Sequence, residues 1–159
     1  MTVHKLHIDE FDEIDYDLVA IHTSLEDYRL AYYINQQLPV LLHKTLDDLQ
    51  IKNKMGTAFF GRFTFECADS NTLWNLIGNH GEVISKNDDD SPNLFGTNVD
   101  IATQVHFLPE YKKVNYFLKI ENPVLPISEV ILAVNKIERI STVYEVDINK
   151  IKSKNNLIF

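Results

Sequence analysis

The segment from Asp17 to Thr23 places the strongest constraint on the fold, because it is apolar on both faces of an extended chain. Side chains alternate between the two faces of a strand. One face would carry Leu18 and Ala20, and the other Val19 and Ile21. A strand that lacks the usual alternation of apolar and polar residues has to be covered on both sides. The sequence therefore predicts a central strand of a sheet near the start of the chain.

Two helices are predicted, and prolines mark their limits. Ser24 offers an N-cap hydroxyl, with Asp27 in the capping-box position, so the first helix should run to Leu38, just before a proline. The second should follow Pro126 and start near Ser128. Its core-facing residues recur at the helical spacing: Val130, Ala133, Val134 and Ile137.

The other strands are predicted from alternation and from β-branched or aromatic residues. They are Met1–Ile8, Val40–Lys44, Ala58–Cys67, Thr72–Gly78, Ile101–Phe107, Val114–Ile120 and Thr142–Ile148. The Ala58–Cys67 strand should form a hairpin with Thr72–Gly78, and Ile101–Phe107 one with Val114–Ile120. Between these hairpins, from Asn79 to about Asn98, the pattern predicts a long loop.

These elements predict one α+β domain that spans residues 1–159. The order of elements is strand, helix, several strands, helix and strand, and no repeat or low-complexity linker divides it. The expected architecture is a two-layer sandwich, in which two helices cover one face of a mostly antiparallel sheet.

Composition excludes several classes of function. The 159 residues carry a formal net charge of −8, so the chain should repel a phosphate backbone and bind no nucleic acid. One cysteine, Cys67, permits no internal disulfide and favours a reducing compartment. The acidic N-terminus is unlike a secretory signal, and no stretch approaches the roughly 18 apolar residues of a membrane span. We expect a cytoplasmic protein without membrane contact.

No motif for a metal, a cofactor or a nucleophile is found. The six histidines have no ligand spacing, and the acidic run Asp88–Asp90 lacks the glycine and glutamate positions of a calcium loop. The glycines form no phosphate-binding loop, and Cys67 should be a core thiol. We therefore predict no cofactor, no metal site and no catalytic residue.

The first helix carries a second apolar stripe that the core does not require. Projection at about 100° per residue places Leu25, Tyr28 and Tyr32 together, on a different side from the stripe that begins at Leu30. An additional core contact would explain the stripe. It would also suit a self-complementary interface, because tyrosine is enriched in interfaces.

The segment between Leu108 and Ile120 joins a charged turn to a strongly alternating strand. Its signature positions are Leu108, Pro109, Glu110, Val114, Asn115 and Tyr116. The spacing resembles the signature of the bacterial IPExxxVDY family, and residues 24–31, 74–76 and 153–159 also look like segments of that family. The resemblance implies no activity. Asn115 stands where the family has an aspartate, which argues against an indispensable acid or base there. A structural role for the signature is the simpler interpretation.

The alternation after the signature also predicts the orientation of that strand. The core-facing residues should be Val114, Tyr116, Leu118 and Ile120. The opposite set would be Lys113, Asn115, Phe117 and Lys119. Because Phe117 would be a lone apolar group among polar neighbours, we expect it at a contact surface. The predicted interaction surface comprises Leu25, Tyr28, Tyr32, Glu110, Asn115 and Phe117.

Three functional hypotheses follow. The first is a non-catalytic protein-interaction or adaptor domain, which has an unknown protein partner and could form a homodimer. The second is a regulatory domain of the ferredoxin-like sensor type that binds a small ligand, an analogy based on the fold. The third, an enzyme, would need Glu66, His106 and Glu110 to meet in one pocket.

Overall fold

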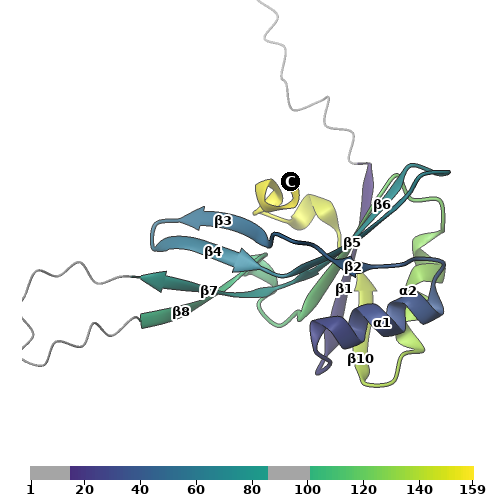
Figure 1. The fold of residues 1–159 in the computed structure, drawn as a ribbon, viewed down its shortest axis with the longest axis horizontal. Helices are drawn as coiled ribbons and strands as arrows, with labels where there is room; N and C mark the ends of the chain where they lie inside the picture. Colours follow the sequence, from purple (N-terminus) through teal and green to yellow (C-terminus); the bar gives the residue numbers. More distant parts are fainter. Residues whose placement is uncertain (1–14, 86–100) are drawn as a thin grey trace, which may run out of the picture.

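The structure is a computed structural model that describes residues 15–85 and 101–159. Figure 1 shows the fold. The helices are α1 (Asp27–Gln37) and α2 (Ile127–Asn135), and the strands are β1 (Tyr16–Thr23), β2 (His43–Lys44), β3 (Leu49–Asn53), β4 (Gly56–Phe60), β5 (Arg62–Cys67), β6 (Thr72–Gly78), β7 (His80–Ser85), β8 (Ile101–His106), β9 (Tyr116–Glu121) and β10 (Ile140–Glu145). The predicted strand Met1–Ile8 lies outside the described residues. No helix in the described part is long and apolar enough to cross a membrane.

Six strands form the main sheet, in the order β10-β1-β9-β6-β5-β2, and every neighbouring pair is antiparallel. Four of these strands, with the two helices, follow the chain order β1, α1, β6, β9, α2, β10. Their spatial order, β10-β1-β9-β6, is that of the split β-α-β-β-α-β motif. The remaining strands are insertions in this motif. The predicted α+β class and mostly antiparallel sheet are confirmed.

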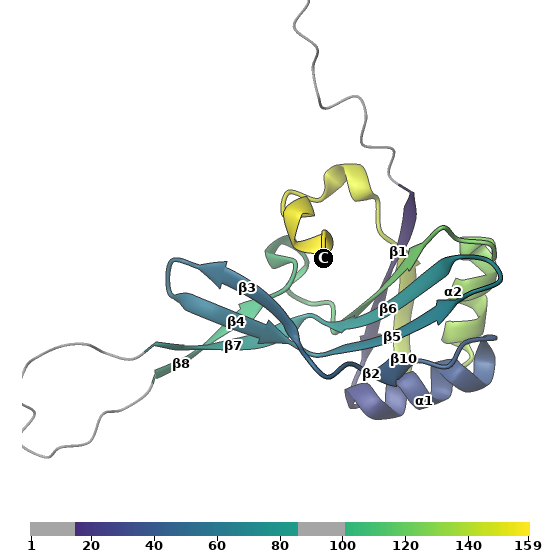
Figure 2. The same ribbon diagram turned by 45° about the horizontal axis from the view of Figure 1, so that its top comes forward.

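Both helices lie on one face of the main sheet, as predicted (Figure 2). α1 packs on the sheet through Leu30, Ala31 and Ile34, and α2 through Val130 and Val134. We call the apolar cluster between the helices and the sheet the first core.

The opposite face of the main sheet is covered by a second sheet and by the C-terminal segment. The second sheet has the order β3-β4-β7-β8 and extends well beyond the main sheet (Figure 1). The C-terminal segment contains two short 3-10 helices, Ile148–Lys150 and Lys154–Leu157. The apolar cluster beneath them, the second core, includes Phe60, Val83, Phe107, Phe117, Val146, Ile151 and Leu157.

β1 separates the two cores, which confirms that it is buried on both faces. Val19 and Ile21 belong to the first core, and Leu18 and Ala20 to the second. All four side chains have no exposed surface. The strand lies inside the sheet, between β9 and β10.

Several predicted strands and their pairings are wrong. The predicted strand Ala58–Cys67 is broken at Gly61 into β4 and β5, which belong to different sheets, because an alternating pattern does not reveal where a chain crosses between sheets. The predicted hairpin of Ile101–Phe107 with Val114–Ile120 does not form. β8 instead pairs with β7, and β9 pairs with β1 and β6. Within the predicted loop, His80–Ser85 is strand β7.

Some predicted boundaries also shift. α1 begins at Asp27, with Glu26 as its N-cap, so Ser24 lies before the helix and does not cap it. Only His43 and Lys44 of the predicted Val40–Lys44 strand pair with β5. β10 ends at Glu145, before the predicted end at Ile148.

Candidate functional site

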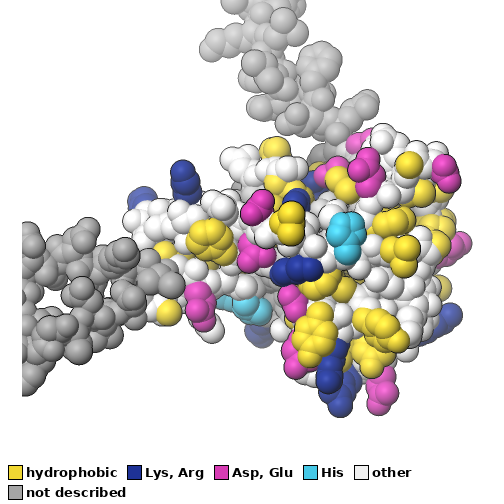
Figure 3. Space-filling view, viewed as in Figure 1, with side chains coloured by type: hydrophobic (Ala, Val, Ile, Leu, Met, Phe, Trp, Pro, Cys, Tyr) yellow, Lys and Arg dark blue, Asp and Glu magenta, His cyan; other side chains and the backbone are white. Residues whose placement is uncertain are grey.

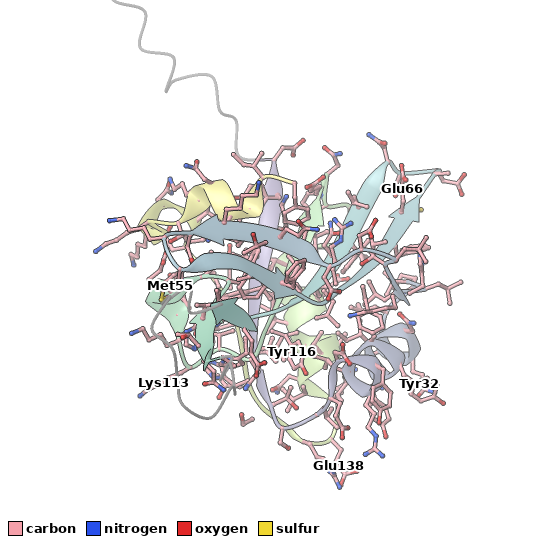
Figure 4. The ribbon with its side chains drawn as sticks, turned by 60° about the vertical axis from the view of Figure 1, so that its left-hand side comes forward. Tyr32, Met55, Glu66, Lys113, Tyr116 and Glu138 are labelled. Atoms are coloured by element: carbon pink, nitrogen blue, oxygen red, sulfur yellow. The ribbon has the colours of Figure 1, made fainter. Side chains whose placement is uncertain are left out.

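The outer face of α1 carries exposed aromatic side chains that the first core does not use. Tyr28 is 57% exposed and Tyr32 is 58% exposed. They lie four residues apart and therefore share one side of the helix. Hydrophobic side chains gather over α1 in Figure 3, and Tyr32 points away from the sheet in Figure 4. We call Tyr28 and Tyr32 the tyrosine face.

Leu25 was predicted to belong to this surface, and that prediction is wrong. Its side chain is only 5% exposed and packs in the first core. Because α1 begins at Asp27, a helical projection cannot be extended back to Leu25. Its backbone is held instead by Thr23 Oγ1, which accepts a hydrogen bond from Leu25 N at 3.1 Å, and by Tyr116, whose hydroxyl donates to Leu25 O at 2.8 Å.

A cleft of about 480 Å³ opens at the N-terminal end of α1, next to the tyrosine face. Its lining comes from the end of β1, the start of α1, the end of β6 and the starts of β7 and β9, and includes Asp27, Gly61, Gly78, His80, Asn115 and Tyr116. Because Gly61 and Gly78 have no side chains, the backbone itself forms this part of the cleft wall. The volume is in the range of small-molecule sites, about 300–1,000 Å³.

Charges around α1 are compensated locally. Arg29 Nε lies 3.4 Å from Glu26 Oε2, and Lys44 Nζ lies 3.5 Å from Asp27 Oδ2. Burial, together with the carboxylates of Asp27 and Glu26, raises the pKa of Tyr116 to about 12. The Tyr116 hydroxyl is therefore a neutral hydrogen-bond donor throughout the physiological pH range.

The signature residue Glu110 binds the C-terminal segment. It belongs to a short 3-10 helix, Pro109–Tyr111. Its carboxylate accepts hydrogen bonds from Lys152 N and Ser153 N, both at 2.8 Å, and from Ser153 Oγ at 3.0 Å. Partial burial raises the pKa of Glu110, but the hydrogen bonds together outweigh burial and lower it. The predicted site residue Glu110 thus makes an intramolecular contact.

The side chain of Asn115 binds the backbone of β1 at a point where the strand pairing is irregular. The register of β1 against β10 shifts between His22 and Thr23, and Asn115 Oδ1 accepts from Thr23 N at 2.9 Å. An aspartate at this position could accept the same hydrogen bond. Asn115 also lines the cleft.

Phe117 does not lie on an exposed surface, so its predicted place in an interaction surface is wrong. The alternation is confirmed within β9, because Leu118 and Ile120 lie in the first core and Phe117 points to the other face. Val114 was predicted on the side of Leu118, and that part is wrong: it precedes β9 and packs in the second core with Phe117. That face is covered by the chain's own second layer, and Phe117 has no exposed surface. Its ring packs edge-on against Tyr111, with the ring centroids 6.1 Å apart.

The residues of the enzyme hypothesis do not meet. Glu66 lies near the outer end of the β5–β6 hairpin, and Figure 4 shows it on the side opposite Lys113 of the signature loop. His106 packs against His80, with centroids 5.0 Å apart, while Glu110 binds the C-terminal segment. Burial, His80 and Lys112 lower the pKa of His106. The described residues contain no group of three or more side chains that could hold a metal ion.

The sequence analysis did not single out two buried polar residues, Asn79 and Lys119, as structurally important. Asn79 is completely buried. Its amide nitrogen donates to Tyr111 O and Val114 O, while its amide oxygen accepts from Leu108 N. Lys119 is only 4% exposed. Neither has a local sequence signal, because a buried polar residue is recognised by its partners, which are distant in sequence.

No family model matches the sequence, and searches of curated proteins and of solved structures find no match either. The class of protein is defined by the fold and the site: it is an α+β domain with an exposed aromatic helix face beside a cleft.

Proposed function

We propose that this chain is a non-catalytic binding domain that acts through protein contacts, and that the tyrosine face joins two copies in a homodimer. The observation that carries the proposal is the exposure of Tyr28 and Tyr32, 57% and 58%, on a helix whose core contacts are made by other residues. Tyrosine buries a large area at low entropic cost and is enriched in interfaces.

Local charge at this surface permits a second copy as the partner. The whole chain carries −8, so most faces of two copies repel each other. Around α1, Arg29 pairs with Glu26, and Lys44 pairs with both Asp27 and Asp48, so the local net charge is small. Two copies can therefore approach through α1 with little repulsion.

A two-fold axis next to α1 would make the contact isologous. Each Tyr28 and Tyr32 pair would pack against the same pair of the second copy. Arg29 and Glu26 flank the tyrosines, so each could also face its counterpart of opposite charge in the second copy.

Sedimentation equilibrium tests the dimer. We expect the wild-type chain to have twice the monomer mass at micromolar concentration, and the double variant Tyr28→Ser, Tyr32→Ser to be a monomer. Met55→Ser is the matched control, because Met55 is 51% exposed in the turn between β3 and β4, and this variant should remain a dimer. A monomeric wild-type chain, or a dimeric double variant, would contradict the proposal.

The adaptor role is tested by affinity capture from a lysate, with the double tyrosine variant as the comparison. Partners that use the tyrosine face should be recovered by the wild-type chain and lost with the variant. Recovery of no protein above background would defeat this part of the proposal.

A small-ligand sensor is the second candidate, and the cleft of about 480 Å³ is the observation that favours it. Thermal-shift measurements against free amino acids and nucleotides test it, because a ligand that binds the native state raises its stability. The shift should disappear in Gly78→Val, whose side chain would enter the cleft, and persist in Gly78→Ala. Absence of a shift across the panel would count against a sensor.

A further inference from the structure

A group of polar side chains lies beneath the C-terminal segment, on the second-core face of the main sheet. Asn75 on β6 pairs in register with Thr64 on β5 and with Lys119 on β9. Paired residues of antiparallel strands project to the same face, as do residues two apart along one strand, so Arg62 joins this group. The face thus presents an amide flanked by two cations.

Within residues 15–85 and 101–159, two members of this group carry buried polar atoms without a hydrogen-bond partner. Asn75 is 1% exposed, and neither its amide nitrogen nor its amide oxygen is bonded. Arg62 Nε is buried and also has no partner. Buried polar groups are almost always hydrogen-bonded, because an unbonded group loses its hydration without compensation. Free donors and a free acceptor at one place indicate a site that a polar molecule fills.

The charge at this place is also unbalanced. Lys119 Nζ donates to Glu121 Oε1 and, at 2.7 Å, to Leu157 O. In the described part of the chain no carboxylate lies within 4.0 Å of the Arg62 guanidinium. An uncompensated cation next to a free amide favours an anion that accepts hydrogen bonds.

Phe159 forms the cover of this group. Its ring centroid lies 5.3 Å from Arg62 Cζ and 4.5 Å from Lys119 Nζ, so the ring spans the two cations on either side of Asn75. An aromatic face attracts cations, but it offers no hydrogen bond to a carboxamide oxygen. Phe159 is 43% exposed, and a cavity of about 260 Å³ separates residues 155–159 from β3. The cover is therefore loosely packed on one side.

We propose that Arg62, Asn75 and Lys119 form a binding site for a small hydroxycarboxylic acid, and that Phe159 closes the site when it is empty. The carboxylate of the ligand would accept from the guanidinium of Arg62 and from the amide nitrogen of Asn75. Its hydroxyl would donate to Asn75 Oδ1. This site is separate from the tyrosine face and does not depend on the dimer.

Calorimetric titration with lactate tests the site, with acetate and lactamide as comparison probes. Acetate lacks the hydroxyl and lactamide lacks the charge, so both should bind at least about tenfold more weakly. Phe159→Ala should bind lactate more tightly than the wild-type chain, because the competing closed state is removed. Asn75→Leu should remain folded, since an unbonded amide is replaced by an apolar group of similar size, and should not bind.

Hydrogen exchange gives an independent measurement. Lactate should accelerate exchange of the backbone amides of residues 156–158 as the cover opens, and leave exchange in α1 unchanged. Absence of lactate binding to both the wild-type chain and Phe159→Ala would overturn the proposal, as would equal binding by Asn75→Leu. If Asn75→Leu is destabilised and no probe binds, the amide holds buried water only, and the proposal is wrong.

Discussion

Tyr116 fixes the start of α1 from the adjacent strand. Its ring packs against the first core, and its hydroxyl donates to Leu25 O at 2.8 Å. We expect Tyr116→Ala to lower the free energy of unfolding by about 2–4 kcal/mol, and Tyr116→Phe by about 1 kcal/mol. Lys113 is exposed, so Lys113→Ala should change the free energy of unfolding by less than about 0.5 kcal/mol. Urea titration would measure these values, and equal sensitivity at positions 113 and 116 would contradict the assigned orientation.

Glu110 should give the chain a component of acid sensitivity. Its pKa is lower in the folded chain than in the unfolded chain, so its contribution to stability is present above the ordinary glutamate pKa and is lost as pH falls through the lowered value. Glu110→Gln should therefore be destabilising at pH 7 and much less so near pH 3. The comparison requires denaturant midpoints of both proteins at both pH values. A constant difference between the two proteins would show that the carboxylate charge is unimportant.

At the scale of elements, the close approach of β4 to β7 depends on Gly81. A Cβ atom at this position would lie 2.7 Å from Phe60 Cε1 and 2.8 Å from the backbone oxygen of Phe59. The same addition at Gly78 meets nothing nearer than Gly61 O at 3.9 Å. Gly81→Ala should cost about 1–3 kcal/mol of stability, and Gly78→Ala distinctly less. Thermal unfolding of the two variants checks this, and equal losses would contradict the assigned packing of β4 on β7.

Patterns local in sequence predicted the elements well and their partners less well. The two-faced apolar run of β1 and the helical spacing in α2 are complete within a few residues, so both were recognised. The break at Gly61 and the pairing of β7 with β8 depend on a second sheet, which no local pattern contains. The same limit applies to the site. The exposure of Tyr28 and Tyr32 agrees with the predicted second stripe, whereas the burial of Phe117 depends on a distant C-terminal segment.

At the scale of the whole molecule, the main sheet should make the two cores unfold together. β1, β6 and β9 each supply side chains to both cores. Trp74, the single tryptophan, lies in the first core and reports on it by fluorescence. Phe60→Ala, in the second core, should lower stability by about 3–5 kcal/mol and should shift the Trp74 transition as much as the circular-dichroism transition. Two separated transitions would show that the cores are independent.

The position of β1 also has a consequence for biosynthesis. β1 is made before its two partners in the sheet, β9 and β10, which begin only at Tyr116 and Ile140. At common rates of translation, this apolar strand stays without its native neighbours for on the order of ten seconds. The growing chain thus exposes a strand that is apolar on both faces before that strand can be covered. We therefore expect chaperones that bind nascent chains to recognise residues 16–23.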